Sequence, residues 1–204
     1  MRLLLLSLAT TLQAQFPHCP ATFAQRQDFA VCYDTANRRP LWTAHEIKPS
    51  TTSSRRKHWR KDHELNSQPA AAFTNSGYHR GHLAPAADIP ESDDSFLTSN
   101  AIAQNAQLNA GAWRSLENQI RKKGPAHVIT GAIYNGCGNE QIEAPCEIYK
   151  VARHHDGAIT AALLPNAPAK LQFTTLEAVE RHTGLRFFSD PLPSPTAPAP
   201  PAQP

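Results

Sequence analysis

The sequence lacks an apolar run long enough to cross a bilayer, since its longest one, residues 3–12, is about half of the roughly 20 residues required. It also lacks an internal repeat, and its 204 residues are too few for two large domains. Charged residues make up only 18% of the chain, and 20 Lys and Arg against 17 Asp and Glu leave a formal charge of +3. That excess is too small to identify a polyanionic ligand. Hydrophobic residues, at 40%, instead indicate a globular domain with an ordinary core.

The N-terminal segment has the three parts of a secretory signal. Met1 and Arg2 form a basic start, residues 3–12 form a short apolar core, and Gln13 and Ala14 offer a cleavage site with a small residue. The alternative is a buried N-terminal strand or helix. We expect residues 1–14 to be a signal peptide and the mature protein to be secreted or periplasmic, with no membrane contact.

The four cysteines are even in number and allow three pairings. Short loops favour Cys19 with Cys32 and Cys137 with Cys146, because a disulfide that closes a loop of about 15 residues is worth roughly 3 kcal/mol in the chain-entropy model. Neither pair has the CxxC spacing, which argues against a structural zinc site. Two disulfides agree with an oxidising compartment after export.

Hydrophobic patterning predicts strands and helices without a βα repeat. The predicted strands cover residues 28–34, 38–47, 127–134, 147–154 and 158–164. The predicted helices cover residues 105–123 and a shorter segment that a capping box at 174–177 opens and Gly184 ends. This order favours an α+β fold, mainly an antiparallel sheet with flanking helices. We expect the domain to cover residues 15–189, followed by a Pro-rich disordered tail at 190–204.

Residues 78–82, Tyr-His-Arg-Gly-His, form the most informative stretch. Gly81 lets the backbone turn tightly beside a ligand, Arg80 presents a planar fork to phosphate, and neutral His82 can accept a proton near physiological pH. Taken alone, His82 is as consistent with a hydrogen-bonded structural histidine as with a catalytic one.

The predicted helix at 105–123 carries a second group of polar candidates. One stripe at helical spacing comprises Asn109, Trp113, Leu116 and Ile120, of which the three apolar residues indicate core. Glu117 lies eight residues after Asn109, about 80° round the helix, so both side chains can approach one ligand. Glu117 and Arg121 are four residues apart, and the alternative for them is a surface ion pair.

A basic run at residues 55–61, Arg-Arg-Lys-His-Trp-Arg-Lys, is the third candidate. Positive charges interleaved with Trp59 suit backbone phosphates and one stacking surface. The alternative for Lys57 and Lys61 is a solvated face of the protein.

In this order, the motif and the helix resemble the DNA/RNA non-specific endonucleases, the Serratia-type branch of the ββα-metal nuclease superfamily. The resemblance runs from roughly Tyr33 to Phe188. It also includes Trp42, Leu97-Thr98-Ser99-Asn100, Gln104, Thr130-Gly131 and Thr183-Gly184-Leu185. It implies a ββα-metal catalytic core within the α+β fold.

The resemblance implies a role for each candidate residue. His82 would be the general base that deprotonates water, and Asn109 the one direct protein ligand of Mg²⁺, for which Mn²⁺ can substitute. Glu117 would hold the hydrated metal through water, because Mg²⁺ keeps several waters. The other catalytic residues, which contact phosphate, would be Arg80, Arg121 and Arg56. The substrate-binding residues would be Arg55, Arg56, Trp59, Arg60, Asn100 and Gln104.

One residue departs from the family pattern, since His79 stands where the motif normally begins with aspartate. The predicted function is a secreted, Mg²⁺-dependent endonuclease that cleaves DNA and RNA to 5′-phosphorylated products without sequence specificity, through phosphate contacts. Because His79 removes a carboxylate beside the metal, one alternative is a nucleic-acid-binding protein of the same fold with weak or no catalysis. Another is a toxin or effector nuclease restrained by an inhibitor protein.

Overall fold

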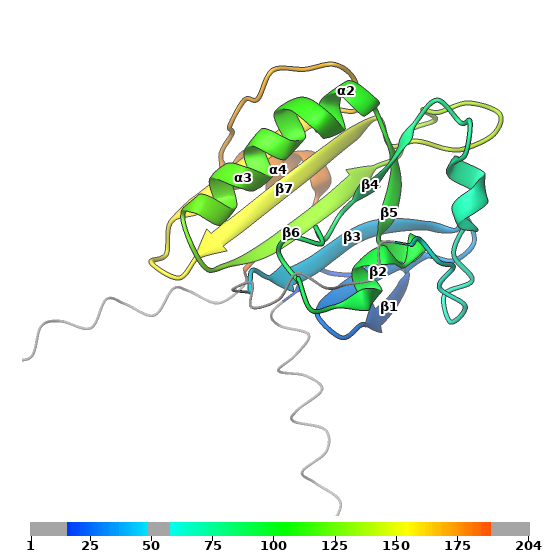
Figure 1. The fold of residues 1–204 in the computed structure, drawn as a ribbon. Helices are drawn as coiled ribbons and strands as arrows, with labels where there is room; N and C mark the ends of the chain where they lie inside the picture. Colours follow the sequence, from blue (N-terminus) through cyan, green and yellow to red (C-terminus); the bar gives the residue numbers. More distant parts are fainter. Residues whose placement is uncertain (1–15, 49–57, 189–204) are drawn as a thin grey trace, which may run out of the picture.

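The computed structural model describes residues 16–48 and 58–188 (Figure 1). The predicted signal segment 1–14, the candidates Arg55, Arg56 and Lys57, and the predicted tail at 190–204 lie outside this part of the chain. Within the described residues, no helix has the length and apolar character to span a bilayer.

A six-stranded antiparallel sheet in the order β1-β2-β3-β6-β7-β8 forms the framework. Its strands are β1 (Thr22–Gln25), β2 (Phe29–Asp34), β3 (Arg39–Glu46), β6 (Ala126–Ile133), β7 (Glu147–His154) and β8 (Ile159–Pro165). This confirms the α+β class and the five predicted strands. Strand β1 escaped prediction because only Ala24 of its four residues is buried, which leaves no alternation to read.

Each face of this sheet is covered by a helix. Helix α3 (Arg114–Lys122) lies across β6 and β7, and α4 (Leu176–Thr183) lies on the opposite face (Figure 1). The α3 face packs Leu116 and Ile120 against strand residues such as Val128 and Ile148. The α4 face packs Val179 against strand residues that include Trp42, Ile129 and Val151.

Helix α4 begins one residue later than its predicted capping box. Thr175 is the N-cap, and its side-chain oxygen accepts a hydrogen bond from the Ala178 N–H at 3.2 Å. Thr174 cannot start the helix because it forms an isolated β-bridge with Ala161 at the edge of the sheet.

The predicted helix at 105–123 forms, but with a wider turn near its start. It runs through α2 (Ala106–Leu108), a π-helical turn at Asn109–Trp113, and α3. Asn105 caps it, since its Oδ1 accepts from the Gln107 and Leu108 N–H groups at 3.0 and 3.1 Å. Single π turns are frequent at functional sites, and this one begins at the candidate metal ligand.

A second, two-stranded sheet pairs β4 (His79–His82) with β5 (Ala101–Gln104) in antiparallel register. Three short 3₁₀ helices precede or join these strands, at Ala70–Phe73, Asp93–Phe96 and Thr98–Asn100. Because α2 follows β5 directly, the order β4, β5, helix is a ββα unit (Figure 1). Both strands have four residues, too few for a period to show in the sequence.

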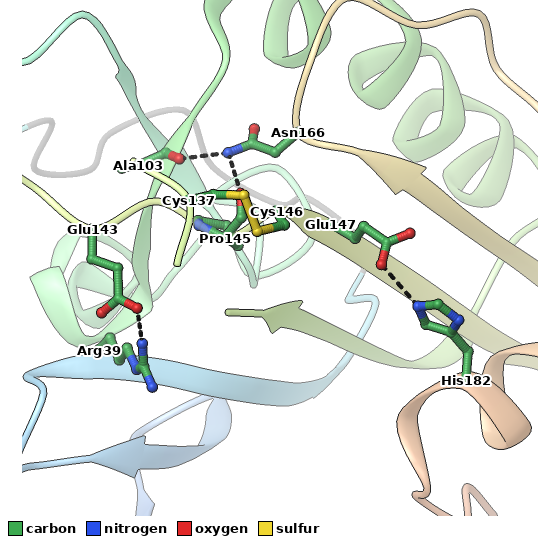
Figure 2. The surroundings of a disulfide bond; sticks show 9 residues. All are labelled: Arg39, Ala103, Cys137, Glu143, Pro145, Cys146, Glu147, Asn166 and His182. Carbon is green, nitrogen blue, oxygen red and sulfur yellow. Dashed lines mark hydrogen bonds and ion pairs between the residues drawn. A yellow bond between two sulfur atoms is a disulfide. The ribbon is translucent and has the colours of Figure 1, made fainter. Parts of the chain in front are cut away.

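The two disulfides join the cysteines as predicted, Cys19 with Cys32 and Cys137 with Cys146. The second closes the connection between β6 and β7 (Figure 2). Beside it, the Asn166 amide donates to the carbonyls of Ala103 in β5 and Pro145. The disulfide loop is thereby held against the ββα unit.

Candidate active site

The ββα unit brings two of the candidate side chains into contact. His79 begins β4 and pairs across the hairpin with Gln104, just before the helix starts. Its Nδ1 lies 3.4 Å from the Asn109 side-chain nitrogen. Since an amide NH₂ only donates, His79 Nδ1 is the acceptor. The Oδ1 of Asn109, to which no described residue donates, is left to face another ligand.

Arg80 and His82 share one face of β4, because alternate strand residues point the same way. The Arg80 side chain is exposed and makes one long hydrogen bond of 3.5 Å to the Ala70 carbonyl. It can turn toward a phosphate with little loss of protein contacts.

The His82 ring packs against two aromatic rings that also contact each other, and the residue remains partly exposed. Its centroid lies 4.4 Å from that of Trp59 and 5.1 Å from that of Phe96. The indole ring thus orients the candidate base, which sequence spacing alone could not show. Trp59 is itself partly exposed, so its role as a stacking surface for bases stays a prediction.

Gly81 is required by a close approach inside the hairpin. A Cβ there would lie 2.0 Å from the Gln104 Oε1 and 2.7 Å from its Cβ. Gln104 is fully buried, and neither amide atom has a hydrogen-bond partner among the described residues. Two expectations are therefore corrected: Gly81 makes room for a side chain and not for a ligand, and Gln104 packs beneath β4 where it cannot contact substrate.

Asn100 and Arg60 both have hydrogen-bond partners within the fold. Asn100 is fully buried, accepts from the Ala84 N–H at 2.8 Å and donates to the Ala84 and Ser95 carbonyls. Arg60 donates to the Asp93 carbonyl at 2.6 Å and to the Asp94 carboxylate at 2.8 Å. The assignment of Asn100 to substrate binding is corrected, because its side chain is buried and its amide is satisfied, whereas Arg60, whose side chain is 35% exposed, stays a predicted substrate-binding residue. Asn100 fixes the chain two residues after His82.

Glu117 and Arg121 do not form the surface pair that their spacing allowed, because each has a buried partner of opposite charge. Glu117 pairs with Lys150 of β7, with Nζ and Oε1 3.4 Å apart, and Lys150 is 1% exposed. Arg121 donates to Asp88 at 2.6 Å and to Asn118 at 2.7 Å. These bonds use two of the five guanidinium N–H groups, so Arg121 keeps donors for a phosphate contact.

This network continues to β3 and back to the motif. The Asp88 carboxylate also accepts from His45 Nε2 at 2.9 Å. Lys150 Nζ donates to the carbonyl of Leu83, the residue after His82, at 3.4 Å. It also lies 5.3 Å from the centroid of the Trp113 ring. The charged groups under the α3 helix are therefore linked to the backbone that carries His82.

The titratable groups of this network shift in different directions. Burial would raise the pKa of Asp88, but its bond and charge contacts with His45 and the charges of Lys150 and Arg121 lower it to about 2. Burial lowers the pKa of His45, against the opposing hydrogen bond and charge of Asp88, and its Nδ1 has no partner among the described residues. Burial raises the pKa of Glu117, which the charges of Lys150 and Arg121 only partly offset.

The donors at this site fit a hydrated divalent cation. The Asn109 amide oxygen has no donor among the described residues, and the Glu117 carboxylate stands two helical turns further on. Mg²⁺ takes oxygen ligands and keeps several waters, so one amide oxygen with a carboxylate acting through water suffices. The imidazole of His79 is not counted among these ligands, because its Nδ1 accepts from the Asn109 amide.

Sequence reasoning missed the residues that surround these donors. Lys150, His45 and Asp88 entered no prediction. One signal was available, since a lysine within the apolar run of β7 must be paired if that central strand is buried. His45 and Asp88 offered none, because their contact joins parts of the chain 43 residues apart.

The chain was compared with families and proteins already known. A family model described as DNA/RNA non-specific endonuclease matches residues 9–194. The mitochondrial nuclease EXOG of Xenopus laevis is 28% identical over 214 residues, covering 85% of this chain and 60% of that protein. The mitochondrial endonuclease G of Homo sapiens is 27% identical, covering 84% of this chain and 71% of that protein. This chain thus spans about three fifths to seven tenths of these two relatives.

A solved structure shows the same fold. The crystal structure of the EndoG/EndoGI complex, which describes the mechanism of EndoG inhibition, aligns with a TM-score of 0.71 at 22% identity. The alignment covers 89% of this chain and 91% of that chain.

The comparisons contradict one prediction, the secreted or periplasmic location. The two relatives above and a nuclease of Saccharomyces cerevisiae that is 26% identical are named as mitochondrial nucleases. The prediction came from residues 1–14, which lie outside the described part of the chain, and from cysteine pairing. Such local signals are weaker than similarity along the whole chain, and the predicted location is wrong on this comparison.

Proposed function

Since the chain belongs to the DNA/RNA non-specific endonuclease family, we propose that it hydrolyses phosphodiester bonds of both DNA and RNA, leaving 5′-phosphorylated products. The proposal is supported by one arrangement: Arg80 and His82 share a face of β4, while the helix that follows β5 presents Asn109 against the same hairpin. A proton acceptor, a phosphate ligand and a metal ligand are thus carried by a single ββα unit.

In this mechanism the side chains of the ββα unit divide the work. His82, oriented by the rings of Trp59 and Phe96, accepts a proton from the attacking water. Arg80 contacts the phosphate through its planar guanidinium. Asn109 holds the cation, Mg²⁺ with Mn²⁺ able to substitute, and Glu117 assists through water. When bound, the cation supplies charge neutralisation at the phosphate and at the leaving 3′ oxygen.

The partners in this proposal are DNA and RNA, bound through their phosphates with little sequence specificity. An inhibitor protein is a further proposed partner, because the structural relative was solved in a complex with one. A nuclease restrained in that way would release its activity when the complex dissociates.

The test is incubation of the purified protein, disulfides intact, with supercoiled plasmid and with RNA, in Mg²⁺ and in EDTA. We expect both substrates to be degraded in Mg²⁺ only. His82→Ala should lower the rate by about 10²–10⁴ while binding of DNA in EDTA is retained. His63→Ala, which changes an exposed histidine away from the site, is the matched control. Normal turnover in His82→Ala would refute the general-base assignment.

A second candidate function rests on the contact between His79 and Asn109. An imidazole beside the metal ligand, in place of the usual carboxylate, favours a nucleic-acid-binding protein with weak or no catalysis. That function would be selected if the wild type binds duplex DNA tightly but leaves it intact with every divalent metal. Recovery of cleavage in His79→Asp would then identify His79 as the cause.

A further inference from the structure

A group of three potential metal ligands lies on the sheet face opposite helix α3. It consists of Glu46 at the end of β3, His127 near the start of β6, and His155 directly after β7. One ligand atom from each lies within 4.8 Å of the others. We refer to Glu46, His127 and His155 as the rim triad.

The backbone holds the rim triad in place. Glu46 and His127 are directly opposite each other in the β3–β6 register. The His155 N–H donates to the carbonyl of Pro125 at 3.3 Å, which ties the turn after β7 to the strand that carries His127. Since all three positions are fixed by strand pairing or by this bond, the donors are brought together by the sheet and not by flexible loops.

The spacing of the donors suits a small cation with tetrahedral coordination. Zn²⁺ binds nitrogen and carboxylate oxygen at about 2.0–2.1 Å, so neighbouring donors in a tetrahedron lie about 3.3 Å apart. His155 Nε2 and Glu46 Oε1 are 3.2 Å apart, already at that separation. Since no two of these ligand atoms are more than 4.8 Å apart, the His127 nitrogen needs to move by at most about 1.5 Å to reach that separation.

The chemistry of the rim triad selects among cations. Two imidazoles and one carboxylate suit Zn²⁺ and related transition metals, whereas Mg²⁺ and Ca²⁺ require mainly oxygen ligands. Burial, together with the charges of Arg153 and His155, lowers the pKa of His127 against the opposing effect of Glu46. Arg153 itself is turned toward Phe188, with its guanidinium carbon 4.6 Å from the ring centroid.

A fourth coordination position is open to solvent. All three side chains are exposed, and Glu46 and His127 also line a groove of about 330 Å³ on this face of the sheet. Water from this groove can complete the tetrahedron. Three protein ligands and one exchangeable water are the usual arrangement of an open zinc site.

We propose that the rim triad binds Zn²⁺ or a similar transition-metal ion, separately from the cation of the nuclease site. The two sites are on opposite sides of the sheet. Along β6, odd-numbered residues such as His127 and Ile129 face α4, while Val128 packs with the α3 helix. Metal binding at the rim triad bridges β3, β6 and the turn after β7, and therefore stabilises the folded sheet.

The test is calorimetric titration of Zn²⁺ into the full chain carrying Asn109→Ala, which weakens the nuclease metal site. We expect one equivalent of Zn²⁺ to bind. Adding His127→Gln or His155→Gln should lower the affinity by at least about tenfold. Replacing Zn²⁺ with Co²⁺ should give a visible absorption band of a tetrahedral site, which the same variants lose.

The matched control is His182→Gln. His182 Nε2 lies 2.8 Å from Glu147 Oε2 on the same face of the sheet (Figure 2). Among the described residues, this histidine–carboxylate pair has no third potential metal ligand. Zn²⁺ binding should be unchanged in this variant, and the Mg²⁺-dependent nuclease rate should be unchanged in His127→Gln. Zn²⁺ binding that is absent from the parent, or equal in parent and His127→Gln, would overturn the proposal. Equal melting temperatures without metal exclude misfolding as the cause of a loss.

Discussion

The two faces of the six-stranded sheet hold their charged residues in opposite ways. On the α3 face, Lys150, Asp88 and His45 are almost fully buried and paired with one another or with the helix. On the α4 face, the rim triad and the His182–Glu147 pair lie at the exposed edge of an apolar core. Burying a charged side chain costs desolvation free energy, and proteins tolerate this cost mainly at functional sites. Exposed charged side chains stay hydrated, so they can bind an ion without that cost. The comparison therefore predicts that substituting a charged residue destabilises the protein strongly on the α3 face and weakly on the α4 face.

Lys150→Met should have the largest effect on stability. It removes the cation that faces Glu117, leaves the carboxylate buried without its partner, and should reduce the free energy of unfolding by about 3–5 kcal/mol. Urea unfolding measures this change. The control is Lys122→Met, at an exposed position of α3, the helix that carries Glu117. It should change the free energy of unfolding by less than about 0.5 kcal/mol. Equal effects from the two variants would show that burial of Lys150 has no energetic weight.

Zn²⁺ should stabilise the α4 face by a comparable amount. At about 100 times the dissociation constant, binding to the folded state alone raises the free energy of unfolding by about 2.7 kcal/mol. We expect this in urea unfolding of the Asn109→Ala chain and its disappearance in His127→Gln. Stabilisation that survives His127→Gln would assign the ion to another site.

Asp88 makes a pH-dependent contribution on the α3 face. Its pKa falls from 3.8 to about 2 on folding, so its contribution is complete above pH 4 and is lost as the pH falls toward 2. Asp88→Asn should reduce stability at pH 7 by about 2 kcal/mol and flatten the stability curve over that acid range. Thermal unfolding at several pH values measures this. Glu140→Gln, an exposed carboxyl, should leave the curve unchanged.

His182→Gln should have the smallest effect. Its ion pair with Glu147 is substantially exposed, with side-chain exposures of 43% and 34%, and such pairs are worth about 0–1 kcal/mol. A melting temperature indistinguishable from that of the wild type is expected. A loss comparable with that of Lys150→Met would contradict the distinction between the two faces.

Most of the main sheet could be predicted because its longer strands are runs of six to eight residues rich in β-branched, aromatic and other apolar side chains, most of which are buried. The β4–β5 hairpin could not, since four residues show no period, and the π turn at Asn109 has no sequence signal. Within the site, the motif and the helix supplied His82, Arg80, Asn109 and Glu117 as candidates. Two surrounding residues were misjudged: Asn100 and Gln104 have amide side chains typical of ligand contacts, but both are fully buried.

The sequence alone determined the local features of the protein: the apolar runs of the strands, the helix caps, the short cysteine loops, and an arginine two residues before a histidine on one strand face. Each of these depends on neighbours within a few positions. Burial and charge pairing depended on the tertiary structure. Lys150 and the Leu83 carbonyl are 67 residues apart, and His155 and Glu46 are 109 apart. Such contacts exist only after the strands assemble, because the sheet determines which side chains leave water and which opposite charges meet there.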